Sequence, residues 1–531
     1  MSLLTEDQGL GMDRAPATKW GPPEDRSGPR GWWETRPFVA ALVLLSMVPL
    51  LLPEVPPLVD LPGHMGRYRV QLDLDSSIFL QRYYGYEWAP IGNLGVDLLL
   101  EPLGRLLGLE PAVKLITLAI PPLTVAGFLW VAREVHHRLP PTALFALPFA
   151  YAHPFMFGFV NYALSVALAF LAFGLWLRLA RQGRFRLRAA LFVPISFIVF
   201  FSHTFGWGVL GLMCFSAEAV RQRDSGKTWL SSVFGAAAQA SLLAFPLFVL
   251  VLWRSDIEGG ITAGWFDAER KYLFLKGVLR DRWKWLDIGS AFLCLVVIAE
   301  TVRRRGMAFS RNLAFSALVL LLVFLIMPYV VFSSAYADMR LIPYVIAVAL
   351  LAIRFREPLP VRTAQMFAVL GLAFVLVRLA GNSWSLALAA EDHRAKLAAL
   401  DRVPAGARVL SLVGDGCGTR WRLPRNTHLG AMVIVRRHGF SNDQWASEGV
   451  NLLKFRYQDA GQFTTDPSQI VRADSCRQSA AWTLEEALQH VPRDAFDYLW
   501  LIDPSPFDPK LVAGMRQVWR GRGSVLYRIR P

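Results

Sequence analysis

Three ionisable side chains follow one another at the end of the first apolar run of the chain. The segment VDLPGHMGRYRV, residues 59–70, contains Asp60, His64 and Arg67. A carboxylate at the edge of a membrane-embedded pocket can accept a proton from an attacking hydroxyl group, and partial burial and a neighbouring cation tune its pKa. His64 follows Asp60 by four residues, so a helix that begins here places both side chains on one face. We predict that Asp60 and His64 are catalytic and that Arg67 binds substrate.

A second set of polar side chains interrupts later apolar runs. An arginine fork matches a pair of phosphate oxygens, so Arg340 is predicted to hold a phosphate and to stabilise it as a leaving group. Ionisable groups at membrane depth are costly and tend to line a cavity or pair with one another, so a set that shares one leaflet indicates a site. The predicted substrate-binding set therefore also includes Asp338, His203, His153 and Asn161, and no residue is assigned to a metal.

These residues also have structural alternatives. Asp60 follows the Pro-rich turn PEVPPLVDLP, where an Asp is a favoured helix cap. Arg340 is long enough to snorkel to the membrane surface, with Asp338 as its ion-pair partner. The histidines at 64, 153 and 203 have the alternative of serving only as hydrogen-bonded structural groups. The partners of each side chain in the fold distinguish these alternatives.

The composition places most of the chain in a membrane. Of 531 residues, 54% are hydrophobic and only 18% are charged, below the roughly 25% charged residues of soluble proteins. The net charge of +15 comes mainly from short tracts between apolar runs, which favours contact with anionic lipid headgroups over nucleic acid. Runs long enough to cross about 30 Å of hydrocarbon predict eleven spans, at 38–55, 113–132, 142–159, 161–179, 188–203, 206–221, 229–252, 286–302, 312–332, 340–355 and 363–382.

The charges of the short connections predict the orientation. The basic tracts AREVHHR, RQGRFRLR, RQRDSGK, RRRGMAFSR and RFREPLPVR occupy every second connection. Cytoplasmic loops are enriched in Lys and Arg, so the N-terminus is expected inside and the C-terminus outside. We therefore expect a multi-pass protein of the bacterial inner (cytoplasmic) membrane, with a periplasmic C-terminal domain. The loop at 254–285 is basic although it is expected outside, which suits either an anionic headgroup or phosphate, or a solvated interfacial helix.

Three regions are expected. Residues 1–37 are rich in Pro, Gly and charge and predict a disordered cytoplasmic tail. Residues 38–382 form the transmembrane domain, with a large first outer loop at 56–112 that contains an amphipathic helix near 91–108. Residues 383–531 predict a soluble extracytoplasmic α/β domain, with strands near 407–413, 497–503 and 524–530 and helices near 483–491 and 509–518. In an oxidising space Cys417 and Cys476 have the option of a disulfide, whereas in the cytoplasm both stay thiols.

This order of parts resembles the GT-C superfamily of polytopic membrane glycosyltransferases. The resemblance covers most of residues 38–382 and rests on the Asp that opens the first outer loop, on PIGNLGVDLLLEPLGRLLGLEPAVKLITLAIPPLTVAGFLWVAREV and on DMRLIPYVIAVALLA. It implies a polyprenyl-phosphate sugar donor, Asp60 as the catalytic base or acceptor-binding residue, and Arg340 as the contact to the donor phosphate. The family often has paired acidic residues in this loop, whereas LPGH follows Asp60 here, so a divalent metal cofactor stays open.

Three function classes are compatible with these features. The first is an enzyme that transfers a sugar from a polyprenyl phosphate to a glycan, lipid or protein acceptor outside the cytoplasm. The second is a transporter or flippase of lipid-linked sugar, which would favour internal repeats and broken helices at the midplane. The third is a non-enzymatic membrane scaffold for envelope assembly. We expect the first, in a GT-C-like fold of about 11 transmembrane helices, with membrane lipids and the lipid-linked sugar as partners.

Overall fold

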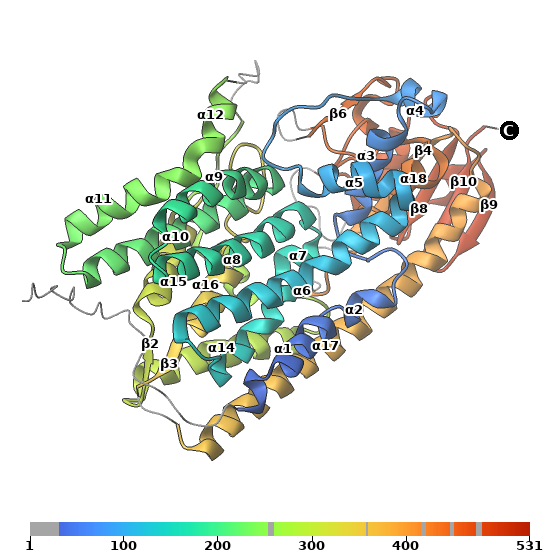
Figure 1. Ribbon diagram of the computed structural model, residues 1–531. Coiled ribbons are helices and arrows are strands. Elements are labelled where there is room, and N and C mark those ends of the chain that lie inside the picture. The colour runs from blue at the N-terminus through green and yellow to red at the C-terminus, as the bar shows by residue number, and fades with distance from the viewer. Residues whose placement is uncertain are drawn as a thin grey trace, which may run out of the picture.

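The computed structural model describes residues 31–252, 260–356, 359–415, 421–446, 451–473 and 481–530. Over these residues the chain forms a helical domain and, at one end of it, a C-terminal domain built on a β-sheet (Figure 1). Most of the predicted tail and both Cys417 and Cys476 lie outside the described residues. Residues 31–37, which were predicted to belong to the tail, form η1 (Trp32–Glu34) and the start of α1 (Arg36–Leu45).

Six helical segments of the described chain are long and apolar enough to cross a membrane. In lipid a helix satisfies all its backbone polar groups internally, which explains why the apolar runs fold in this way. The segments are α6 (Leu109–His136), α8 (Val160–Arg181), α9 (Phe185–Ser202), Trp229–Val249 within α11 (Trp229–Ala240), η3 (Ser241–Ala244) and α12 (Phe245–Leu252), α14 (Lys284–Arg303), and Val361–Arg402, which contains α17 (Val361–Leu397) and η4 (Ala398–Arg402).

Further helices complete the apolar bundle. They are α1 with α2 (Val48–Leu51), α10 (Thr204–Asp224), α15 (Arg311–Ile326) and α16 (Ile342–Leu351), with α13 (Ala268–Lys276) in the connection before α14. Every predicted span except 142–159 therefore contains a helix or a run of consecutive helices, although 312–332 extends beyond the end of α15 and 340–355 includes β3 (Ile353–Phe355). The count of helices that cross the membrane stays a prediction, because several of these elements are shorter than a full span.

The predicted span at 142–159 is not one helix. It consists of η2 (Pro141–Tyr151), a 3₁₀ segment, and the short α7 (His153–Phe157). Proline lacks a backbone N–H and fixes φ, and the prolines at 141, 148 and 154 interrupt α-helical hydrogen bonding here. Every residue of η2 is buried, so this irregular backbone lies within protein. The break leaves His153 and Phe157 at the end of the helical domain that faces the C-terminal domain.

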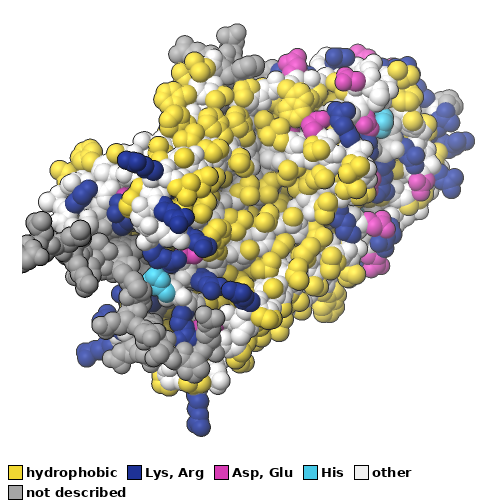
Figure 2. All heavy atoms as spheres, in the orientation of Figure 1, with side chains coloured by type: hydrophobic (Ala, Val, Ile, Leu, Met, Phe, Trp, Pro, Cys, Tyr) yellow, Lys and Arg dark blue, Asp and Glu magenta, His cyan; other side chains and the backbone are white. Residues whose placement is uncertain are grey.

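The basic connections meet at the opposite end of the helical domain. Arg138 pairs with Glu34 at 3.0 Å and Arg181 pairs with Glu134 at 2.5 Å. The strands β2 (Met307–Phe309) and β3 (Ile353–Phe355) pair antiparallel with each other and so link two of the basic tracts. Figure 2 shows a band of hydrophobic side chains between this end and the C-terminal domain. The basic tracts, which occupy every second connection, therefore lie at one end of the bundle.

The long connection between α2 and α6 folds against the C-terminal domain. It contains α3 (Leu61–Asp73), α4 (Ile78–Tyr83), β1 (Tyr84–Tyr86) and α5 (Gly95–Leu107), and α5 corresponds to the predicted amphipathic helix. Strand β1 pairs antiparallel with β6 (Leu453–Phe455), and α3 packs against α18 (Met432–Arg437). This connection therefore joins the two domains.

The C-terminal domain contains a six-stranded mixed sheet in the order β5-β4-β8-β10-β9, with β7 also paired to β4. β4 (Arg408–Asp415) runs parallel to β5 (Phe440–Ser441), β7 (Ile470–Arg472) and β8 (Tyr498–Ile502). β10 (Ser524–Arg528) runs antiparallel to β8 and β9 (Arg516–Gly521). Short helices complete the described domain: η5 (Leu429–Ala431), η6 (Gly461–Phe463), α19 (Leu484–Gln489) and η8 (Pro509–Val512).

Two expectations about this domain change. The helix predicted at 509–518 is η8 followed by a turn and the first three residues of β9, because Gly514 adopts a φ of 83° and the chain then pairs with β10. The expected boundary at 383 falls inside α17, which continues to Leu397. The strands predicted near 407–413, 497–503 and 524–530 are β4, β8 and β10, and the helix predicted at 483–491 is α19.

Candidate functional site

A cavity of about 2520 Å³ lies between the helical domain and the C-terminal domain. This is larger than the roughly 300–1,000 Å³ typical of a site for one small molecule, so two substrates have room in it. Seven of the eight predicted site residues line its wall, and Asp338 does not. The seven are Asp60, His64, Arg67, His153, Asn161, His203 and Arg340.

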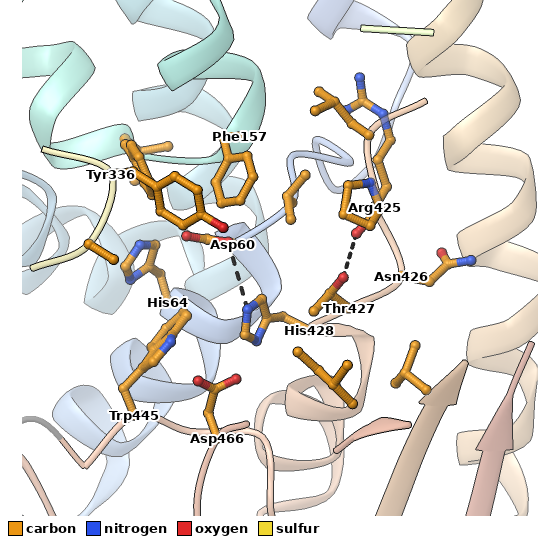
Figure 3. Close-up of a pocket in the computed structure, with 18 of the residues that line it drawn as sticks. Asp60, His64, Phe157, Tyr336, Arg425, Asn426, Thr427, His428, Trp445 and Asp466 are labelled. Atoms are coloured by element: carbon orange, nitrogen blue, oxygen red, sulfur yellow. Dashed lines mark hydrogen bonds and ion pairs between the residues drawn. The ribbon is translucent and has the colours of Figure 1, made fainter. Parts of the chain in front are cut away.

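Asp60 stands at the N-terminus of α3 with its carboxylate facing the cavity, beside Phe157 and Tyr336 (Figure 3). Its backbone N–H donates to the carbonyl of Phe157 at 2.9 Å. A Cβ on Gly158 would lie 2.6 Å from that backbone nitrogen, and Gly158 has a φ of 102°, so only glycine fits this close approach. The Asp60 side chain makes no capping hydrogen bond, although it occupies the N-cap position. The carboxylate therefore does not cap α3, which was the structural alternative for Asp60.

The C-terminal domain places His428 against Asp60. The Nε2 atom of His428 lies 3.7 Å from Oδ1 of Asp60, and its Nδ1 lies 2.5 Å from Oδ1 of Asp443. The segment that carries His428 is anchored by Arg425, which pairs with Asp281 at 2.6 Å and donates to the carbonyl of Pro57. The contact between the two domains therefore determines where His428 lies.

Burial and neighbouring charges raise the pKa values of both Asp60 and His428. Burial raises the pKa of Asp60 to about 7, although the charges of His428 and Arg340 act in the opposite direction. Burial alone would lower the pKa of His428, but the charge and hydrogen bond of Asp443 outweigh it and raise that pKa to about 9. At neutral pH, His428 is therefore a cation beside a carboxyl group that is about half ionised, which suits a general base.

Arg340 is a buried cation at the cavity wall. Its side chain is flanked by the rings of Phe159 and Phe205, whose centroids lie 4.4 and 5.1 Å from Cζ. Nη1 donates to the hydroxyl of Ser334 at 3.1 Å, and Nε has no hydrogen-bond partner among the described residues. The residue is only 5% exposed. A guanidinium held in this way, without a carboxylate in contact, is a ready anion site.

Asp338 has a different partner from the one expected. Its carboxylate accepts from Nζ of Lys271 at 3.1 Å, and Lys271 also donates to the carbonyls of Phe324 and Met327. Asp338 therefore fixes the segment before α16 to α13 and α15. It does not neutralise the neighbouring Arg340, which explains how Arg340 keeps its charge for a ligand.

The three predicted site histidines, His64, His153 and His203, line the cavity in different ways. His203 caps α10, because its Nδ1 accepts the backbone N–H of Phe205 at 3.1 Å. His153 is buried at the start of α7, and neither ring nitrogen has a partner among the described residues. The ring of His64, on α3, lies against that of Trp445 in a tilted arrangement with centroids 5.0 Å apart, and its Nδ1 likewise has no partner among the described residues. His203 thus has a structural task, while His153 and His64 keep donors or acceptors for a ligand.

Arg67 and Asn161 line the cavity, yet both use their polar groups on Asp97. Arg67 Nη2 lies 2.8 Å from one Asp97 oxygen, and Asn161 Nδ2 donates to the other at 3.1 Å. Asn161 Oδ1 also accepts the backbone N–H of Val96 at 2.6 Å. These contacts tie α3, α5 and α8 together, so they support a positioning task for both predicted substrate-binding residues.

We expect Asp97→Ala to destabilise the protein by about 3–5 kcal/mol, because it leaves the Arg67 guanidinium buried without its counter-ion. The double variant Arg67→Leu with Asp97→Leu is expected to lose less stability, because no charge is then left unpaired. Unfolding in detergent, followed by tryptophan fluorescence, measures both. If Asp97→Ala is as stable as the parent, Asp97 is not needed to compensate the Arg67 guanidinium. That result would support the prediction that Arg67 binds substrate.

The sequence-based prediction missed the half of the site that the C-terminal domain supplies. His428, Asp443, Trp445 and Asp466 lie in irregular segments of that domain. The signal for them was modest: a His in the segment NTHLG and an Asp at the end of FSND, immediately after a short strand. No pattern within the chain places these segments next to Asp60, because only the docking of the two domains does so.

Among the described residues, His428, Asp443 and Asp466 are close enough to be considered as a metal site, with donor atoms within 4.8 Å of one another. Two ligands of a tetrahedral ion at about 2.0–2.2 Å from the metal lie more than 3 Å apart. The 2.5 Å contact between His428 and Asp443 is shorter. It has the length of a charge-assisted hydrogen bond, so we interpret His428 and Asp443 as a hydrogen-bonded pair, with Asp466 nearby.

No protein-family model matches the chain, and no curated protein matches it. Among solved structures, the chain is similar to the crystal structure of ArnT from Cupriavidus metallidurans in the apo state, with 14% sequence identity and a TM-score of 0.46. The alignment covers 93% of this chain and 97% of that chain.

Proposed function

We propose that the protein is an integral membrane glycosyltransferase that moves a sugar from a polyprenyl-phosphate donor to an extracytoplasmic glycan, lipid or protein acceptor. The observation that carries the proposal is that Asp60 and Arg340 both line the wall of one cavity at the end of an apolar bundle. The charge of Arg340 acts on Asp60 across this cavity and lowers the pKa of its carboxyl group. A base and an anion site in one cavity are what transfer from a sugar phosphate requires.

The chemistry assigns one task to each group. Arg340 donates hydrogen bonds to the donor phosphate and stabilises the charge that develops on it. Asp60 accepts the proton of the acceptor hydroxyl as the hydroxyl oxygen bonds to the anomeric carbon. The bond from that carbon to the phosphate oxygen breaks, and its electron pair stays on the polyprenyl phosphate. No residue forms a covalent bond to the sugar, and Asp60 is left protonated at the end of the step.

An apolar arm of the cavity supports a lipid-linked donor. Beyond Phe205 the wall continues along α10 with Gly208 and Leu212 and along α15 with Val323. A chain of isoprene units entering here would leave its phosphate near Arg340, beside the ring of Phe205. The cavity thus combines an apolar path for a lipid with a polar end for a sugar phosphate.

We expect Gly208→Trp to reduce transfer from a long-chain donor roughly tenfold or more, and to affect a donor of two or three isoprene units less. A Cβ at Gly208 meets nothing within 4 Å, so a side chain starts there without a clash, and an indole at this position occupies part of the arm. The matched control is Gly211→Trp on the same helix, where a Cβ also meets nothing within 4 Å but which does not line the cavity. Equal losses for both donors, or for both variants, would contradict an isoprenoid-chain path along α10.

The proposed function is tested with the purified protein in nanodiscs. The protein is incubated with polyprenyl phosphates that carry different sugars, together with an envelope lipid and glycan extract as acceptor. We expect at least one donor to release polyprenyl phosphate with transfer of its sugar. Movement of the intact donor across a vesicle membrane, without release, would instead support a flippase.

We also propose the orientation and the location that the loop charges predict. The C-terminal domain and the cavity then face the periplasm of a bacterial inner membrane, and the basic end faces the cytoplasm. A cysteine introduced at exposed Glu391, beside the cavity, is then expected to react with a membrane-impermeant maleimide in intact spheroplasts. Protection of this cysteine until lysis would reverse the orientation.

A further inference from the structure

Three side chains form a line that crosses the boundary between the two domains. His428 comes from the C-terminal domain, and Asp60 comes from the helical domain (Figure 3). Asp443 follows β5 in the C-terminal domain. The imidazole lies between the two carboxylates, at 2.5 Å from Asp443 and 3.7 Å from Asp60. Asp443 forms the closed end of this line, fixed within the protein, and Asp60 forms the open end, which faces the cavity.

The closed end of the line is rigidly built. Asp443 is fully buried, and its second oxygen accepts the backbone N–H of Ala431 at 3.1 Å. Its backbone N–H donates to the hydroxyl of Ser441 at 3.3 Å. Asp443 therefore has no access to substrate, and its free carboxylate oxygen is directed at Nδ1 of His428. This contact fixes the ring orientation and keeps a proton on Nδ1.

The open end lacks such constraints. The Asp60 carboxylate accepts no hydrogen bond at its capping position, and its only ion-pair partner among the described residues is His428. The residue is 8% exposed, so water contributes little to stabilising its charge. The ionisation of Asp60 must therefore depend on the charges that the protein places around it.

We propose that His428, oriented by Asp443, is a positioning residue that keeps the Asp60 carboxylate ionised and directed at the acceptor hydroxyl. This inference rests on the proposed function, and it assigns a part of the site to the C-terminal domain. With protons on both nitrogens, His428 presents a positive charge to Asp60 and to Asp443 at once. When Asp60 takes the acceptor proton, His428 neither gains nor loses one, so the step stays balanced.

Other charged groups around Asp60 act with known signs. Arg340 favours the ionised form of Asp60, whereas Asp466 and Asp443 oppose it, and the hydroxyl of Tyr336 also faces it. On the His428 side, Asp443, Asp60 and Asp466 favour its charged form. His64 has its own pKa lowered by burial and by the charges of Arg67 and His428. Removal of the positive charge of His428 is therefore expected to raise the pKa of Asp60, whereas removal of the negative charge of Asp466 is expected to lower it.

The test measures the protonation of Asp60 without any substrate. The full-length protein in nanodiscs is titrated between acid and alkaline pH, and infrared difference spectra follow the protonated carboxyl band that is absent in Asp60→Asn. An opposite charge within about 4–6 Å lowers the pKa of an acid by roughly 1–3 units. His428→Gln is therefore expected to raise the midpoint of this band by about one unit or more.

The matched variant is Asp466→Asn, which removes a like charge and is expected to move the midpoint in the other direction, toward lower pH. Asp466 accepts from Gln469 Nε2 at 2.5 Å, and an asparagine oxygen preserves that contact. Thermal unfolding identifies any variant that fails to fold.

The outcomes separate this inference from the proposed function. An unchanged midpoint in folded His428→Gln overturns the inference, whether or not the protein transfers a sugar. If the midpoint moves as expected but no donor is consumed, the network stands and the proposed function fails. If a chelator shifts the midpoint as strongly as His428→Gln does, a bound ion controls Asp60, and the inference is overturned. With an active donor, the acid limb of the rate profile is expected to move with the infrared midpoint.

Discussion

Asp60→Asn is expected to abolish sugar transfer while the protein stays folded. General-base catalysis contributes about 10²–10⁴-fold to a rate, so the variant is expected to lose that factor. Asparagine has nearly the same size, and the native carboxylate makes no capping hydrogen bond whose loss would unfold α3. The rate of polyprenyl phosphate release in the presence of acceptor measures the first effect. Size-exclusion chromatography and thermal unfolding in detergent measure the second.

Asp415→Asn provides a control for this result. Asp415 also lines the cavity, but its carboxylate lies 3.8 Å from Arg472 on the neighbouring strand β7. It has no part in the proposed chemistry, so activity is expected to stay within about twofold of the parent. A folded Asp60→Asn protein that keeps its activity would remove the base from the account. Such a result, with a required C-terminal domain, would favour the scaffold alternative.

Arg340→Met is expected to lower kcat/KM for the donor by about 10²–10⁴-fold without loss of stability. Hydrogen bonds to a charged group contribute about 1.5–3 kcal/mol each, and two such bonds to a phosphate account for the range. The guanidinium is buried with one hydrogen bond to Ser334 and no carboxylate in contact among the described residues. Removing an unpaired buried charge relieves a desolvation cost, so the unfolding temperature is expected to stay level or rise.

Two further arginine variants sharpen this prediction. Arg340→Lys keeps the charge but loses the planar fork, so we expect an intermediate kcat/KM. Arg378 is equally buried, but it pairs with Asp287 at 2.7 Å and donates to the carbonyl of Leu279. Arg378→Met is therefore expected to destabilise the protein, in contrast to Arg340→Met. If both variants only destabilise, Arg340 is a structural residue as well.

Apolar run length and loop charge predicted most of the helical domain. A run such as 161–179 has one stable form in lipid, so α8 follows from hydrophobicity alone. The same reasoning failed at 142–159, where hydropathy is high but three prolines decide the backbone. It also failed at 509–518, where a glycine turn and pairing with β10 outweigh a helical pattern. Local backbone chemistry and strand pairing are what the hydropathy pattern omits.

The candidate site was predicted in part for the same reason. Asp60 and Arg340 were recognisable because a charge in or beside an apolar run needs an explanation. Arg67 and Asn161 drew the same attention, but the structure gives them Asp97 as a partner. His428 and Asp443 were not recognisable, because polar residues are ordinary in a soluble domain. Only the docking of that domain onto α3 turns them into neighbours of Asp60.

The most direct test of the central claim is a cryo-EM structure of the protein with a bound polyprenyl phosphate. The account predicts that the phosphate contacts the Arg340 guanidinium at about 2.7–2.9 Å, with the lipid along α10 and the Asp60 carboxylate across the space of one sugar ring. A phosphate bound away from Arg340, or separated from Asp60 by more than a sugar, would contradict it.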